Sequence, residues 1–202
     1  MPSSRAAALA ALRRTLSSQG ALVDPEPRGG VPTGFASLDA ISGWPSPGLA
    51  EIVGLPGAGR MGLLLPLLAR TTHAGRWVAL IDVLGRLHPP GLIGLSWSRM
   101  LVVRPGAERA VWVAEQLAAA GAVPVVVLLD PLPVGRAGYR LLRAAEQGGS
   151  TAVVVGERRE QSLPASLRLE ALGHGPGSLR VCLHRAPGRH QPGRELELSA
   201  SG

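Results

Sequence analysis

The sequence predicts an α/β fold in which a central, mostly parallel sheet is flanked by helices. Short apolar runs rich in Val, Ile and Leu recur along the chain, and turn residues bound each of them. Unbroken apolar runs indicate strands that are buried on both faces, as in a parallel sheet covered by helices. Helix-like stretches separate the runs and supply the crossovers between parallel strands. A chain of 202 residues suits one such domain.

The first 20 residues predict an amphipathic helix that is tethered to this domain. Leu9, Leu12 and Leu16 form one apolar stripe at i, i+3 and i+7 among alanines. Residues 21–34 are rich in Pro and Gly, so we interpret them as a linker to a core domain of residues 35–202. Because an isolated helix of this length is marginal, we expect the stripe to pack on the chain's own core or on a partner subunit.

The predicted elements of the core follow in order. The apolar runs that predict parallel strands are 49–54, 76–82, 99–105, 124–130 and 151–157, and the helix-like stretches between them are 61–75, 106–121 and 135–149. In the second helix Ala110, Trp112, Val113, Leu117 and Ala120 share one face, so we expect Trp112 in the core.

The C-terminal part of the chain has a different pattern. Segments 165–172, 177–185 and 194–200 alternate apolar and polar residues with no helix between them. This pattern predicts an antiparallel extension of the sheet with one solvated face. The single cysteine, Cys182, falls on one of these segments, and we interpret it as a buried structural thiol.

The charge balance favours contact with polyanions only weakly. The net charge is +7, and all 21 basic residues are arginines spread along the chain. Arg158, Arg159, Arg185 and Arg189 are the candidate contacts to a phosphate backbone, the last two beside a predicted Pro-Gly turn.

Neither a membrane segment nor a metal site is indicated. No apolar run reaches the ~18 residues that span a bilayer, and the N-terminus lacks the pattern of a secretory signal. We therefore expect a cytoplasmic protein without a membrane partner. His184 and His190 have no carboxylate or cysteine arranged beside them in the sequence, so we expect both at the surface and no metal.

A glycine-rich loop after the first predicted strand carries the main functional signal. Gly54 and Gly59 hold the two glycine positions of a Walker A phosphate loop, G-x-x-x-x-G-K-[ST]. Arg60 replaces its lysine, and a wide guanidinium fits poorly in a pocket for a compact ammonium. Met61 replaces the hydroxyl residue, and a thioether is a poor ligand for magnesium. Pro66 adds strain in the helix that follows. We interpret the loop as a vestigial phosphate site kept as a tight turn for packing.

A second motif precedes this loop. The pattern T-G-x-x-S-L-D is formed by Thr33, Gly34, Ser37, Leu38 and Asp39. With the loop, it resembles the start of the RecA ATPase core, and the similarity continues to the C-terminal segments over roughly residues 5–198. Within the RecA relatives the chain looks most like the ImuA family of bacterial translesion mutagenesis cassettes. The resemblance implies a RecA-like core with a C-terminal hairpin.

The resemblance also assigns catalytic roles that these side chains do not fit. The position of RecA's catalytic glutamate falls on Leu84, and the positions that contact adenine fall on His88 and Gly91. Asp130 keeps the Walker B carboxylate, which we interpret as vestigial. Because the positions for metal, water and base have changed together, we expect a chain that is not an enzyme and that uses no cofactor.

The same resemblance implies partners. The segments that correspond to the DNA-gripping loops of RecA, 131–140 and 158–166, are short, so strand exchange is not expected and direct DNA contact stays open. RecA subunits dock an N-terminal helix on the neighbouring core, and we expect a groove for such a helix here. The implied partners are ImuB, a Y-family-like polymerase homologue, an error-prone C-family DNA polymerase, and RecA as a further candidate.

The expected function is therefore that of a non-catalytic accessory protein of the SOS response and DNA repair, which acts in translesion synthesis through protein contacts. Two alternatives remain. One is an unusual RecA-family ATPase in which Arg60 and Asp130 suffice and a partner completes the site. The other is a cell division inhibitor of the SulA kind, which is also related to RecA.

Overall fold

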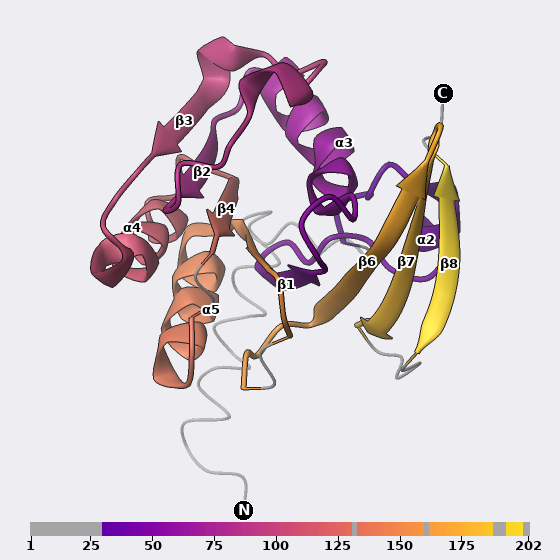
Figure 1. The fold of residues 1–202 in the computed structure, drawn as a ribbon. Coiled ribbons are helices and arrows are strands. Elements are labelled where there is room, and N and C mark those ends of the chain that lie inside the picture. Colours follow the sequence, from indigo (N-terminus) through magenta and orange to yellow (C-terminus); the bar gives the residue numbers. More distant parts are fainter. Residues whose placement is uncertain (1–29, 131–132, 160–161, 188–192, 200–202) are drawn as a thin grey trace, which may run out of the picture.

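The computed structural model describes residues 30–130, 133–159, 162–187 and 193–199 (Figure 1). The predicted N-terminal helix with Leu9, Leu12 and Leu16 lies outside these residues, as do most of the predicted linker and Arg189. Their roles therefore stay predictions. No helix in the described ranges combines the length and the hydropathy that crossing a bilayer requires.

One mixed sheet of eight strands organises the described part of the chain. Its strand order is β3-β2-β4-β5-β1-β6-β7-β8, and the six strands from β3 to β6 in this order are parallel to their neighbours. The strands are β1 (Gly48–Val53), β2 (Val78–Asp82), β3 (Met100–Val103), β4 (Val125–Leu129), β5 (Thr151–Gly156), β6 (Leu167–Gly175), β7 (Ser178–Arg185) and β8 (Arg194–Ser199). The α/β fold with a mostly parallel sheet is confirmed.

The C-terminal strands form the antiparallel part that the sequence predicts. β6 pairs antiparallel with β7, and β7 pairs antiparallel with β8. Burial alternates along the first residues of β6, as the alternating sequence pattern requires for a strand with one solvated face. β6 is also the parallel neighbour of β1, so the two parts share one continuous sheet.

Helices cover both faces of the sheet and create two separate layers of core (Figure 1). The helices are α2 (Ala36–Asp39), α3 (Arg60–His73), α4 (Ala107–Ala119) and α5 (Arg136–Gly148), with short 3₁₀ turns η1 (Pro89–Gly91) and η2 (Trp97–Arg99). The side chains of α2 and α3 pack in one layer, and those of α4 and α5 pack in the other. The predicted crossover helices are thereby confirmed.

Pro66 does not end the helix in which it lies. α3 runs from Arg60 to His73 with Pro66 inside it, although proline removes one N–H from the helical ladder. The ring packs against Gly34. A Cβ atom added to Gly34 would lie only 2.4 Å from the Cβ of Pro66, so the contact requires glycine. The T-G-x-x-S-L-D motif, which precedes the glycine loop, thus packs against α3, which follows the loop.

Two sequence predictions about burial are wrong. Trp112 is 58% exposed instead of lying in the core, because α4 buries the face made by Ala110, Ala114 and Ala118. The small alanines let the helix approach the sheet closely, and the larger residues flank that contact. β3 is the other exception, since it lies at the sheet edge and its Leu101 and Val102 are more than a third exposed.

Candidate functional site

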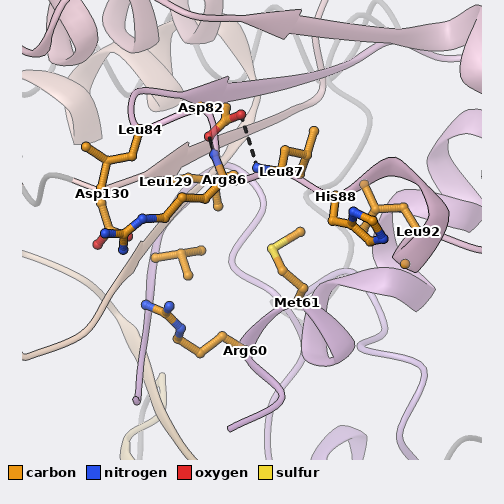
Figure 2. Close-up of a pocket in the computed structure, with 12 residues that line it drawn as sticks. Arg60, Met61, Asp82, Leu84, Arg86, Leu87, His88, Leu92, Leu129 and Asp130 are labelled. Carbon is orange, nitrogen blue, oxygen red and sulfur yellow. Dashed lines mark hydrogen bonds between the residues drawn. The ribbon is translucent and has the colours of Figure 1, made fainter. Parts of the chain in front are cut away.

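A cavity of about 240 Å³ lies at the carboxyl ends of β2 and β4, beside the start of α3 (Figure 2). In open parallel sheets this edge is where ligands bind. The cavity is lined by Arg60, Met61, Asp82, Leu84, Arg86, Leu87, His88, Gly91, Leu92, Leu129, Asp130 and Val155. The structure thus brings together most of the positions that the sequence comparison with RecA singled out, from four separate segments.

The glycine loop joins β1 to α3, and glycine is required at its positions for different local reasons. Gly59 is the residue before α3 and has φ of 95°, a left-handed conformation that other residues adopt at a cost. A Cβ on Gly59 would also lie 2.6 Å from Leu179 Cδ2 of β7. Gly57 has φ of 82°, but a Cβ there would meet nothing within 4 Å. Both the turn conformation and packing therefore explain Gly59, whereas the turn conformation alone explains Gly57.

Arg60 places a buried cationic atom at the cavity. Its Nη1 has no hydrogen-bond partner among the residues that the structure describes, although solvent does not reach it. A buried charged donor without a partner costs free energy, and an anion in the cavity would remove that cost. Arg60 is also the first residue of α3, where the helix dipole favours negative charge. The residues here fit an anionic group such as phosphate.

Asp82 organises the loop on the opposite wall of the cavity. Its carboxylate accepts hydrogen bonds from the backbone N–H groups of Arg86, at 2.9 Å, and Leu87, at 3.2 Å. Arg104 Nε donates to the same carboxylate at 3.2 Å, and the Asp82 side chain is 2% exposed. The sequence analysis gave Asp82 no role. The available signal was a carboxylate at the end of a buried strand, next to a short polar loop.

Asp130 directly follows β4, and in Figure 2 it faces Arg60 and Arg86. Its φ of 29° is the only positive value among the described residues other than glycine, which marks a strained turn. Burial raises the pKa of the Asp130 carboxyl above its ordinary value. The charge of Arg60 opposes this rise, Glu157 adds to it and Arg86 opposes it.

Arg86 extends across the cavity toward Asp130 (Figure 2). Its Nη1 lies 3.4 Å from Glu157 Oε1 in an ion pair that is about half exposed on both sides. Such exposed pairs contribute little to stability, so the Arg86 guanidinium is available to a ligand.

The cavity does not fit a magnesium ion held by protein ligands. Met61 supplies sulfur where an oxygen ligand is needed, and the Leu84 side chain carries no polar atom. The described ranges contain no group of three His, Cys, Asp or Glu side chains that could hold a metal. Leu84, His88 and Gly91 line the same cavity as Arg60 and Asp130.

The candidate nucleic-acid contacts lie elsewhere. Arg158 and Arg159 are exposed in the loop after β5, and Arg185 is exposed at the end of β7. None of these three arginines lines the cavity.

The interpretation of His184 needs correction. His184 is not an unaccompanied surface residue, because its Nε2 lies 2.6 Å from Glu170 Oε2 and its side chain is 18% exposed. The antiparallel pairing of β6 and β7 brings these two residues together. Cys182, on β7 opposite Glu170, is buried as expected. Burial raises the pKa of its thiol, with further contributions from Glu170 and Glu195.

Comparisons with known proteins support the RecA-like superfamily. A RecA protein of Ruminococcus albus is 36% identical over 104 residues, which are 48% of this chain and 26% of that protein. A RecA protein of Nautilia profundicola is 33% identical over 115 residues, 52% of this chain and 32% of that protein. The matched region therefore spans about a quarter to a third of these relatives. No protein-family model matches the chain.

A crystal structure of the RadB recombinase has the same fold. Its TM-score is 0.65 at 21% sequence identity, and the match covers 84% of this chain and 95% of that one. This likeness confirms the RecA-like core with an antiparallel C-terminal part. The expectation that the chain is not an enzyme is contradicted, because the relatives are RecA proteins and a recombinase, which point to an enzymatic family.

Proposed function

We propose that this chain is a RecA-like, nucleotide-binding accessory protein of a bacterial translesion-synthesis complex, in which a partner subunit completes the ATP site. The proposal places it with the ImuA family in the cytoplasm, as the sequence motifs suggest. Its partners would be an ImuB-type protein, an error-prone C-family DNA polymerase and RecA.

The observation that carries the nucleotide part is the buried Nη1 atom of Arg60 beside the cavity that Asp130 also lines. Arg60 Nη1 has no hydrogen-bond partner in the described part of the chain. The same cavity is lined by the glycine-loop helix and by the end of β4, where RecA-like folds hold the phosphates. A phosphate group would satisfy the orphaned donor.

The need for a partner follows from what the cavity lacks. Its volume of about 240 Å³ lies below the roughly 300–1,000 Å³ typical of pockets that enclose a small-molecule ligand. Leu84 offers no general base, and His88 and Gly91 offer the ligand no carboxylate or tyrosine ring. A partner surface that closes over the cavity would enlarge the area that encloses the ligand and would supply the missing general base.

An apolar sheet edge supports the contact with other proteins. β3 ends the sheet on one side, with Leu101 37% and Val102 40% exposed. Trp112 is 58% exposed on the helix that follows β3. An exposed apolar edge strand of this kind accepts a partner strand or an apolar helix.

The experiment combines partner capture with ATP hydrolysis. The purified chain is mixed with the ImuB-type protein and the C-family polymerase, and phosphate release is measured for each component and for the mixture. We expect the chain to co-purify with the ImuB-type protein, and we expect phosphate release by the mixture to exceed the sum of the components. Asp130→Asn should remove this excess without affecting co-purification.

A matched pair of variants tests the surface. Leu101→Asp on β3 should weaken partner capture, whereas Leu172→Asp on β6, at a position that is also 37% exposed, should not. Failure to capture both the ImuB-type protein and the C-family polymerase would contradict the accessory role. Phosphate release by the mixture that is insensitive to Asp130→Asn would contradict the nucleotide site.

A further inference from the structure

We propose that the cavity binds the phosphate groups of a nucleotide through the guanidinium groups of Arg60 and Arg86, without a divalent metal ion. The proposal rests on the proposed nucleotide binding and specifies its chemistry. It assigns to two side chains the charge neutralisation that a Walker A lysine and a magnesium ion share in other phosphate loops.

The first guanidinium is poised for an anion. Arg60 Nη1 is buried and has no hydrogen-bond acceptor among the described residues. This unsatisfied donor lowers the stability of the protein without a ligand. The planar fork of arginine binds phosphate oxygens in pairs, which a lysine ammonium does not do. The substitution of arginine for lysine therefore changes the kind of phosphate contact and keeps its charge.

The second guanidinium is held over the same space. The carboxylate of Asp82 binds the backbone N–H of Arg86 at 2.9 Å and so fixes the start of its side chain at the cavity wall. The Arg86 guanidinium pairs with Glu157 at 3.4 Å, in an ion pair exposed to solvent. Because such a pair is weak, a phosphate with more negative charge can displace Glu157 as the partner of Arg86.

The charges around the cavity fit an anion better than a cation. Arg60 and Arg86 face Asp130, and Figure 2 shows all three at one end of the cavity. The charge of Asp82 is compensated by Arg104 at 3.2 Å.

The metal-binding chemistry is missing at the same place. Met61 follows Arg60 where a hydroxyl would bind magnesium, and a thioether does not replace a hard oxygen ligand. Among the described residues, two carboxylates line the cavity, and Asp82 is already engaged with the loop and with Arg104. A metal ion would have to rely on Asp130 and on the phosphate itself.

The opposite end of the cavity is apolar and suits the remainder of a nucleotide. Met61, Leu92 and the His88 ring lie there in Figure 2, away from the arginines. The anionic phosphates of a nucleotide match the end with the two arginines, and its flat base matches the apolar end.

The test measures binding and does not depend on turnover. The full chain is titrated with ATP by calorimetry, once with magnesium and once with EDTA, and each titration is repeated by thermal shift. We expect dissociation constants that agree within about threefold in the two buffers. Arg60→Ala and Arg86→Ala should each weaken binding roughly ten- to a hundredfold, the loss expected for one charged hydrogen-bonding group. Arg143→Ala, which removes one exposed arginine from α5, should leave binding unchanged.

A double variant adds an independent readout. Arg60→Lys with Met61→Thr restores the Walker A side chains, and we expect its ATP affinity to rise on addition of magnesium. Circular dichroism of each variant verifies that it is folded.

The outcomes separate this inference from the proposed function. ATP binding by the wild-type chain that disappears in EDTA would overturn metal-free binding and leave the proposed nucleotide site standing. Unchanged affinity of Arg60→Ala in EDTA would overturn the role of Arg60. Absence of ATP binding in both buffers, alone and with the partner present, would overturn the proposed nucleotide site itself.

Discussion

Arg168 Nε lies 3.1 Å from Glu51 Oε2, and the two residues face each other on the neighbouring parallel strands β6 and β1. Their side chains are only 12% and 1% exposed, so this ion pair lies inside the sheet that carries the glycine loop. The Arg168 guanidinium also donates to the carbonyl of Leu163. A charged pair thus joins the first strand of the site to the C-terminal extension.

Breaking this pair should be costly. Glu51→Ala leaves a buried guanidinium without its carboxylate, and we expect a loss of about 3–5 kcal/mol in the free energy of unfolding. Replacing both members by apolar residues, as in Glu51→Leu with Arg168→Met, should cost less than the single change. Urea denaturation monitored by circular dichroism measures both, and a double variant less stable than Glu51→Ala would contradict this account.

Asp130 should make the protein less stable at neutral pH than an uncharged residue would. Its pKa is raised in the folded state above the ordinary value of 3.8, mainly by burial, with Arg60, Glu157 and Arg86 as the charged neighbours. Between these two pKa values the folded state holds a proton that the unfolded state releases, so this contribution to stability is lost as pH rises.

The measurement is the melting temperature of the wild type and of Asp130→Asn between pH 3.5 and 7. We expect the variant to gain on the wild type as pH rises through the window above 3.8. A constant difference across this range would show that Asp130 has no raised pKa.

Gly59→Ala should destabilise the start of α3 for two separable reasons. Its φ of 95° strains any residue with a Cβ, at about 1–2 kcal/mol, and the new methyl group would meet Leu179. Gly75→Ala is the control, because Gly75 has φ of 73° but open space around it. In a Leu179→Ala background the excess cost of Gly59→Ala over Gly75→Ala should disappear, as a double-mutant cycle would reveal.

The Cys182 thiol should react slowly with thiol-specific reagents. It is buried, and burial together with Glu170 and Glu195 raises its pKa, so the thiolate is scarce near neutral pH. Because the chain has one cysteine, Ellman's reagent reports on it alone. We expect release of the coloured product at pH 8 to be much slower in the native protein than in guanidinium chloride. Equal rates would contradict the buried position.

Much of the fold could be predicted because continuous apolar runs have few alternatives. β4 and β5 carry Val at half or more of their positions, a pattern that predicts strands covered on both faces, and both strands lie buried in the middle of the sheet. Trp112 could not be placed from periodicity, because α4 has an alanine face and a face of larger residues that overlap. The sequence pattern favoured the larger residues, whereas the close approach of the helix to the sheet selected the alanines.

The sequence allows several residues of the candidate site to be predicted, but it does not predict the hydrogen bonds that they make. The glycine loop, Arg60 and Asp130 are recognisable from their order along the chain. The hydrogen bonds that the backbone N–H groups of Arg86 and Leu87 donate to Asp82 depend on the turn that the loop makes, and spacing alone does not define that turn. The pair of His184 with Glu170 likewise depends on the register of two strands, including its shifts.

The position of β1 in the sheet has a consequence for how the protein is made. Its two neighbours, β5 and β6, come from the far end of the sequence, with Gly48 opposite Thr151 and Ala50 opposite Leu167. Such distant pairing slows folding, since a long stretch of chain must be ordered before the contacts form. On the ribosome, the strand that leads into the glycine loop therefore waits without either neighbour until most of the polypeptide has emerged, and chaperones would meet it in that interval.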